Sequence, residues 1–269
     1  MPPTAPTDSK QPFSAEMKRP FSEILLKRRH WKWFDPSRKV PDATLREIIE
    51  LSRRAPTSFN AQPYKVVLVQ SREAKKNLGC AMLSPLNKEI VEKASLSAVF
   101  FANTQIIGEI PKLQSLFRKT TTAPQEYIDG HLPKGLMVLS QGWTWAITRY
   151  ALSPFLRLVV GVATRMMGII GCKKPLPLLH EPTAWAFKQT AFAIDHFVLA
   201  ATAAGLRTAV MEGFGSEAVC LVLNAPPSKW VPCAMVAIGY AAPGAETKES
   251  RSYSERYPVE EVWYNIDSM

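Results

Sequence analysis

Residues 183–211, TAWAFKQTAFAIDHFVLAATAAGLRTAVM, predict a long apolar helix that is followed at once by a strand. The part up to Leu206 is apolar on nearly every side of a helix, and Gly205 stands where a left-handed residue commonly ends one. A helix of this kind has to lie in the centre of the protein or at an interface. The segment RTAVM, residues 207–211, then predicts the strand.

Helices and strands alternate irregularly along the rest of the chain. The segments 64–70, 95–103 and 232–240 are apolar and rich in strand-forming residues, and each is predicted to be a buried strand. Amphipathic patterns at 20–29 and 41–55 predict two helices before the first strand. We find no internal repeat. The sequence therefore predicts one domain with a helix-flanked sheet, of the α/β or α+β class.

The composition is that of a soluble globular protein with an anionic partner. The chain has 269 residues, of which 46% are hydrophobic and 21% charged, and its formal net charge is +10. This charge favours phosphate, nucleic acid or a lipid headgroup without choosing among them. The cysteines lack CxxC spacing, which predicts reduced thiols in an intracellular protein, cytoplasmic or mitochondrial, and no metal site: Cys80, Cys172, Cys220 and Cys233.

Two segments are expected to lie outside the common core. Residues 1–20 are rich in Pro, Thr, Ser and Lys and predict a flexible N-terminal arm. Residues 135–172 are the most apolar part of the chain, but they contain three arginines, Arg149, Arg157 and Arg165, that leave no uninterrupted membrane-spanning stretch. This segment fits a pair of helices covering the core or a ligand. It also fits a helix lying on a membrane interface or on a partner.

The stretch KRRHWKWF, residues 27–34, gathers basic side chains around two tryptophans. Such a cluster can bind a nucleic-acid strand, a membrane surface or the phosphate of a bound cofactor. Binding of a nucleic-acid strand by stacking its bases on aromatic side chains needs a broad basic groove. The other basic residues are instead scattered along the chain. We therefore expect no nucleic-acid partner.

Five segments taken together resemble the FMN-dependent nitroreductase family. They occur in the family's order at residues 27–49, 54–69, 200–214, 231–240 and 256–263. The resemblance covers roughly residues 21–105 and 183–264 and fails over the intervening insertion, 106–182. It implies a three-layer α+β fold in residues 21–269, with a central mixed sheet flanked by helices. It also implies a homodimer with intertwined termini.

The resemblance assigns the basic cluster to FMN. Arg28, Arg29 and His30 are expected at the phosphate and ribityl end, since a guanidinium grips a phosphate dianion well. Lys32 matches the basic residue near the flavin pyrimidine, where a fixed cation favours the reduced form. This sequence has His30 where serine is common. Trp31 and Trp33 are expected to narrow the mouth of the pocket.

Three further segments complete the site that the resemblance implies. In APTSFN, the cofactor ligands from the second subunit are Pro56, Thr57, Ser58 and Asn60. Against the isoalloxazine ring lie Val210, Met211, Glu212 and Gly213, with the last two offering backbone amides to the flavin N5 and O4 atoms. Near the C-terminus, either Arg251 or Arg256 binds the phosphate; the spacing to Pro258 favours Arg256.

The resemblance implies an oxidoreductase that takes hydride from NADH or NADPH onto FMN and passes electrons to a nitroaromatic, quinone or similar flat acceptor in a ping-pong mechanism. No catalytic side chain is required, because positioning and flavin electrostatics carry the reaction. Reductive dehalogenation is an alternative within this fold, and a non-redox membrane- or nucleic-acid-binding protein is an alternative outside it. The insertion, which contains Trp143, Trp145, Tyr150 and Phe155, is expected to form a lid and is a candidate for peripheral membrane contact.

Overall fold

The computed structural model describes residues 15–141, 182–245 and 254–263, together with the single positions 162, 166 and 247. The four aromatic residues expected in the lid lie outside these residues, as do Cys172 and Arg251. The first helix, α1, spans Ala15–Lys27 and therefore begins within the segment expected to be a flexible arm.

The other elements follow in chain order. Before the second strand they are α2 (Asp42–Ser52), η1 (Ser58–Asn60), β1 (Tyr64–Val69), α3 (Arg72–Gly79) and α4 (Pro85–Lys93). Next come β2 (Leu96–Asn103), η2 (Ile106–Glu109), α5 (Ile110–Thr120), the π-helical turn η3 (Tyr127–His131) and α6 (Leu132–Gln141). The last are α9 (Pro182–Ala203), β3 (Arg207–Met211), α10 (Ser216–Val222), β4 (Trp230–Gly239) and α11 (Val259–Val262).

The four strands of the described residues form one sheet in the order β1-β2-β4-β3. All three pairings are antiparallel, so the prediction of a mixed sheet was wrong for these strands. The reason lies in the connections: α3 and α4 return the chain to the end of β1, and β2 starts there, with Val69 opposite Ser97. One isolated parallel bridge joins His30 to Thr208 beside the edge strand β3.

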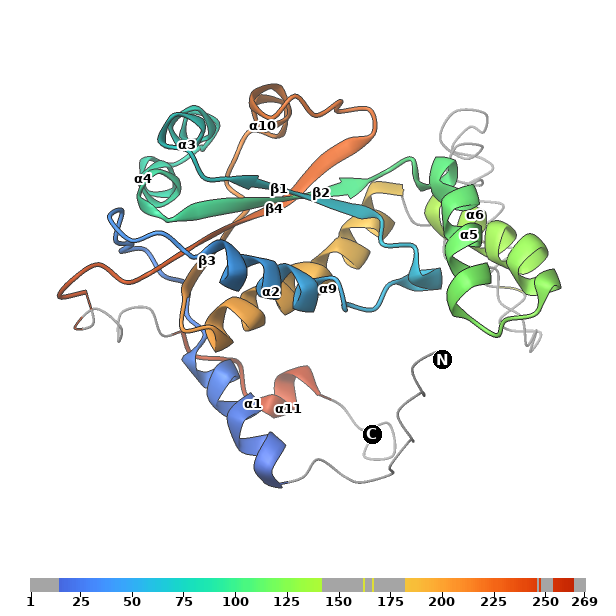
Figure 1. Cartoon of the computed structure of the whole chain (residues 1–269), viewed down its shortest axis with the longest axis horizontal. Helices are drawn as coiled ribbons and strands as arrows, with labels where there is room; N and C mark the ends of the chain where they lie inside the picture. The colour runs from blue at the N-terminus through green and yellow to red at the C-terminus, as the bar shows by residue number, and fades with distance from the viewer. Residues whose placement is uncertain are drawn as a thin grey trace.

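Helices cover both faces of the sheet, which confirms the predicted three-layer arrangement (Figure 1). Alternate residues of β2 point to opposite faces, as the pleat requires. Phe100 packs in the core that α2 and α9 share with the sheet, while Phe101 packs in the core beneath α3, α4 and α10. Every residue of β2 is buried, which explains why its sequence is a continuous apolar run.

The long apolar helix α9 lies centrally on one face, as its sequence predicts (Figure 1). It ends before Gly205, whose φ of 75° is left-handed, and the Leu206 amide then bonds back to the Ala201 carbonyl. One side of α9 is buried against the sheet and α2. The opposite side keeps Phe192 46% exposed, so the helix retains an apolar surface of its own.

Helices α5 and α6, with η2 and η3, pack beside the first half of α9 and form a third apolar cluster around Trp185, Leu132 and Leu136. This layer is the described part of the expected insertion, and Figure 1 shows it at one end of the molecule. No described helix has the length and the apolar character needed to cross a membrane.

Candidate functional site

The basic stretch runs alongside the edge strand β3. Helix α1 ends at Lys27, and the Trp31 amide then donates a 2.8 Å hydrogen bond to the Thr208 carbonyl. The Trp31 side chain is fully buried and packs in the core beneath α3, α4 and α10. Lys32 is exposed. This segment alternates like a strand, so one tryptophan faces the core and the neighbouring lysine faces solvent.

The prediction that Trp31 narrows a pocket mouth was therefore wrong. Its indole N–H donates to the Trp33 carbonyl at 2.7 Å, and the two rings meet edge to face at 5.5 Å. The guanidinium of Arg207 lies 4.8 Å from the centre of the Trp31 ring. Trp31 thus fixes the basic stretch on β3. Only Trp33, which is partly buried, remains near the surface.

Positive charge is concentrated where this stretch meets β3. Arg28, Arg29 and His30 are partly buried and follow one another directly. Burial lowers the pKa of His30, and the charges of Lys32 and Arg28 lower it further. The imidazole is therefore held neutral by its surroundings. The Arg29 guanidinium donates hydrogen bonds to the carbonyls of Leu26 and Arg28. A dianion bound at this place would lie near two arginines and a neutral imidazole able to donate a hydrogen bond.

Residues 210–213, which the resemblance assigns to the flavin ring, lie at the end of β3. Met211 is 3% exposed and Val210 packs toward α9, so their side chains belong to the core and only their backbone can reach a ligand. Glu212 is exposed. A Cβ added to Gly213 would lie 3.0 Å from the Asn87 amide nitrogen, which is tighter than usual. Glycine therefore suits this position, because the Asn87 side chain leaves little room for a Cβ.

The loop 56–62 has an unusual backbone. Phe59, Asn60 and Gln62 have φ angles of 56°, 50° and 44°, in the left-handed region that residues other than glycine seldom adopt. Two side-chain contacts hold this conformation. Gln189 accepts a 2.8 Å hydrogen bond from the Ser58 amide, and the Thr57 hydroxyl accepts one of 3.0 Å from the Gln62 amide. Backbone strain of this kind is typical of ligand-binding loops.

The structure does not bring this loop to the basic stretch within one chain. The loop leads into β1 at Tyr64, which pairs with Ala102 near the end of β2. The basic stretch bridges to Thr208, which pairs with Ile238 opposite Leu96 at the start of β2. Six positions of β2 separate these ends, a span of about 20 Å. Within one protomer, Pro56, Thr57, Ser58 and Asn60 are therefore remote from Arg28.

Arg256 precedes α11 in the C-terminal segment. Its side chain is exposed, and the guanidinium donates to the carbonyls of Ser254 and Glu255 at 3.2 and 3.3 Å. Figure 1 shows α1 and α11 projecting from the same side of the body. The described contacts of Arg256 are thus local, and they leave its other guanidinium N–H groups available for an anion.

Sequence reasoning missed the residues that support the loop 56–62. Gln189 is 3% exposed, and its signal was a lone amide side chain in a mostly apolar helix. Gly135 of α6 was also missed, although it packs so closely on Phe59 that an added Cβ would lie 2.4 Å from the ring. No pattern in the sequence links these two residues, because they meet only after α6 has packed beside α9.

The cysteines within the described residues are free thiols, as predicted: Cys80, Cys220 and Cys233. Burial and the Glu212 carboxylate raise the pKa of Cys233 to about 11, so this thiol stays protonated near neutral pH. No group of histidine, cysteine and acidic residues in the described part of the chain is arranged to hold a metal ion.

A model of the nitroreductase family matches residues 25–128 and 180–240, which include the basic stretch, the strained loop, all four strands and α9. The chain belongs to the nitroreductase family. The matched region extends to residue 128, farther than the boundary at 105 that the sequence suggested. It stops at 240, so Arg256 lies beyond the part of the chain that the family model covers.

Individual members of the nitroreductase family match this chain over different lengths. An NADH dehydrogenase/NAD(P)H nitroreductase of Ralstonia pickettii is 40% identical over 81 residues, which are 30% of this chain and only 40% of that protein. The NADH dehydrogenase of Thermus thermophilus is 28% identical over 239 residues, covering 88% of this chain and 91% of that protein. A nitroreductase from Exiguobacterium sibiricum, solved in complex with FMN, superposes with a TM-score of 0.66 at 19% identity, covering 91% and 96% of the two chains.

Proposed function

We propose that this protein is an FMN-dependent oxidoreductase that accepts hydride from NADH or NADPH and reduces flat acceptors such as nitroaromatics or quinones. The observation that carries the proposal is the placement of the partly buried cations Arg28 and Arg29 beside β3. The family match includes this stretch, and one structural neighbour was solved with FMN. Bound FMN supplies the hydride-accepting and electron-donating chemistry.

The proposed role of the basic stretch is to hold the phosphate of FMN. Arg28 suits a charge-assisted, bidentate contact, and the neutral His30 suits a single donated hydrogen bond. Burial of Trp31 keeps the backbone of the stretch in place, so little backbone order has to be gained on binding. Lys32 is exposed on the side away from the core, where it is proposed to face the pyrimidine edge of the flavin.

The backbone of Glu212 and Gly213 is proposed to lie against the flavin ring. The absence of a side chain at Gly213 allows a close approach, and backbone N–H groups orient the ring without adding charge. No side chain of this chain is proposed to take or give a proton. The protein orients the ring, shields it from water and leaves one face open to the two substrates in turn.

The site is proposed to be completed by the loop 56–62 of a second copy of the chain. Within one chain this loop and Arg28 lie at opposite ends of the sheet, so a site that uses both requires a homodimer. Exposed apolar residues on α1 and near α11 are suited to such an interface, because they include Leu26 at 70% and Trp263 at 77% exposure. Phe192 on the free side of α9 is a third element of it.

The proposal is tested with purified full-length protein. We expect a yellow protein with about one flavin per chain, a dimer by light scattering, and bleaching of the flavin by NADH or NADPH without an acceptor. Adding a quinone or nitroaromatic after the nicotinamide has been removed should restore the colour, since the two half-reactions are separate. A colourless protein that gains no flavin absorbance after incubation with FMN would refute the proposal.

A further inference from the structure

A second basic site lies two strands away from the basic stretch, at the same end of the sheet. It is a pocket of about 1000 Å³ between the segment 36–42, the first half of α3 and the second half of α4. Ser95, just before β2, also lines the pocket, and its hydroxyl accepts a 2.8 Å hydrogen bond from the Val40 amide. None of the residues assigned to FMN lines this pocket.

Cations dominate the lining. Two acidic residues, Asp42 and Glu92, face seven basic ones: Arg38, Lys39, Arg72, Lys75, Lys76, Lys88 and Lys93. Glu92 pairs with Lys88 at 3.9 Å, and Lys93 pairs with Glu89 at 2.6 Å. In the described part of the chain, no ion pair includes Lys39, Arg72, Lys75 or Lys76. These four basic side chains therefore carry positive charge that no described carboxylate neutralises.

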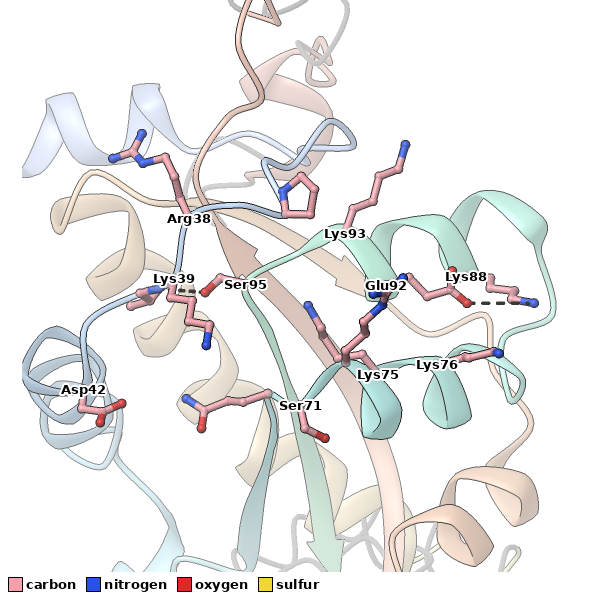
Figure 2. Close-up of a pocket in the computed structure, with 14 residues that line it drawn as sticks. Arg38, Lys39, Asp42, Ser71, Lys75, Lys76, Lys88, Glu92, Lys93 and Ser95 are labelled. Atoms are coloured by element: carbon pink, nitrogen blue, oxygen red, sulfur yellow. Dashed lines mark hydrogen bonds and ion pairs between the residues drawn. The ribbon is translucent and has the colours of Figure 1, made fainter.

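Two of these cations point into the same space. Figure 2 shows the side chains of Lys39 and Lys75 directed toward the centre of the pocket, while Arg38 and Lys93 point away from it. Arg38 is already engaged, since its guanidinium lies 3.6 Å from the centre of the Tyr240 ring. The interior charge of the pocket thus comes mainly from Lys39 and Lys75.

Lys75 is a buried cation, with 8% of its surface exposed. It donates one hydrogen bond to the Ala94 carbonyl, which leaves two of its three N–H groups free. Burial lowers its pKa, and the positive charge of Lys39 lowers it further; no carboxylate acts in the other direction. A buried charge is costly unless it is paired, so this arrangement favours a bound anion.

We propose that this pocket binds the diphosphate or triphosphate group of a soluble ligand such as a nucleotide. A single phosphate carries about two negative charges near neutral pH, which would balance Lys39 and Lys75. It would leave uncompensated Arg72 and Lys76, which also line the pocket and make no described ion pair. A pocket of 1000 Å³ is at the upper end of the range for small-molecule sites, so a nucleoside has room beside its phosphates. The first turn of α3, which begins at Arg72, adds the positive end of a helix dipole.

The site is distinct from the proposed FMN phosphate site. The basic stretch at Arg28 lies beside β3, whereas Ser95 and Ser71 flank β2 and β1 on the other side of β4. The experiment uses full-length protein saturated with FMN, so that free anions do not enter the flavin site. Inorganic tripolyphosphate is titrated by calorimetry at about 0.15 M salt, where nonspecific surface attraction is screened beyond about 8 Å.

The test variant is Lys39→Gln combined with Arg72→Gln, because both residues are exposed and neither makes a described ion pair. The control is Arg46→Gln combined with Lys134→Gln, which removes the same charge from exposed positions outside the pocket. We expect the test variant to lose about tenfold or more in affinity for tripolyphosphate, and the control to change by about twofold or less. Flavin absorbance should be equal in both.

Four outcomes would overturn the proposal. The wild type fails to bind tripolyphosphate at millimolar concentration, or the control weakens as much as the test variant. Alternatively, Arg28→Ala abolishes the calorimetric signal, which would assign the anion to the flavin site. Lastly, the wild type sediments with vesicles containing phosphatidylinositol bisphosphate and the test variant does not, which would place the phosphates on a lipid rather than on a soluble ligand.

Discussion

The backbone amide of Ser58 donates a 2.8 Å hydrogen bond to the side-chain oxygen of Gln189, a buried residue in the first half of α9. This bond joins a strained loop to the most central helix of the fold. Each residue in an unfavourable backbone region costs on the order of 1–3 kcal/mol and persists only when its surroundings hold it there. Gln189 is therefore a structural support of the loop that we propose to contact FMN.

Gln189→Leu tests this support. The variant removes the acceptor for the Ser58 amide, and an unpaired polar group in a protein interior costs about 1–3 kcal/mol. We expect the free energy of unfolding in urea to fall by that amount and the flavin content after dialysis to fall with it. Gln70→Leu, at an exposed position after β1, is the matched control and should change neither quantity. Unchanged stability in Gln189→Leu would show that the loop holds its shape without this bond.

Gly135→Ala tests the other support. An added Cβ would lie 2.4 Å from Cζ of Phe59, well inside van der Waals contact, so the Phe59 ring, the loop or α6 has to move. Overpacking of this kind typically costs about 1–3 kcal/mol. Gly130→Ala is the control, because nothing lies within 4 Å of its Cβ position. Equal melting temperatures for the two variants would contradict the packing of Phe59 on α6.

Local signals in the sequence were enough to predict the strands and the end of α9. The segments 64–70 and 95–103 are apolar runs bounded by polar residues, and Gly205 follows the apolar helix at a position where glycine commonly ends one. The antiparallel pairing could not be predicted, since strand order depends on where the connecting helices return the chain. The burial of Trp31 was missed for a related reason: the segment joins the edge of β3 only in the folded protein.

The backbone of the loop 56–62 was also beyond prediction. In a sequence, glycine is the usual sign of a left-handed φ angle. The loop has none at its left-handed positions, which are Phe59, Asn60 and Gln62. The pocket beneath α3 and α4 was missed because its basic residues come from three separate segments. In the sequence they read as scattered surface charge, and only the packing of α3 against α4 brings them together.

Arg28→Ala tests the proposed phosphate contact. The loss of a hydrogen bond between a charged donor and a phosphate should weaken FMN binding by about 1.5–3 kcal/mol, or roughly 10- to 150-fold in the dissociation constant. The measurement is a fluorescence titration of flavin-free protein with FMN. Arg46→Ala, an exposed arginine on α2, is the control. Full flavin occupancy of the Arg28 variant under dilution would exclude the contact.

The lowered pKa of His30 predicts that the stability of the folded protein depends on pH. Burial and two neighbouring cations lower its pKa in the folded state below the ordinary value near 6.5. Below about pH 6.5, His30 takes up a proton more readily in the unfolded chain than in the folded one. The free energy of unfolding therefore falls as the pH drops from about 6.5 toward the lowered pKa. Above about pH 6.5 the contribution of His30 to the free energy of unfolding no longer changes with pH. In flavin-free protein, urea unfolding between about pH 5.5 and 7.5 should show a smaller slope for His30→Gln than for the wild type; equal slopes would count against this assignment.

Lys32 provides the test of the flavin ring's orientation. The residue is exposed beside the fixed Trp31, and its charge is felt at His30, so it lies at the proposed site with its ammonium free to approach a ligand. A cation at the pyrimidine edge stabilises the anionic reduced flavin more than the neutral oxidised ring. Lys32→Met keeps most of the side-chain volume and removes the charge.

The expected loss in Lys32→Met is about 1–3 kcal/mol of preference for the reduced form, which corresponds to a fall of roughly 20–65 mV in the two-electron midpoint potential. Affinity for oxidised FMN should fall less than in Arg28→Ala, because the oxidised ring carries no charge at that edge. A redox titration against a reference dye measures the potential. If a variant that retains flavin has an unchanged or raised potential, Lys32 does not face the pyrimidine, and its charge belongs with the phosphate-binding residues Arg28 and Arg29 instead.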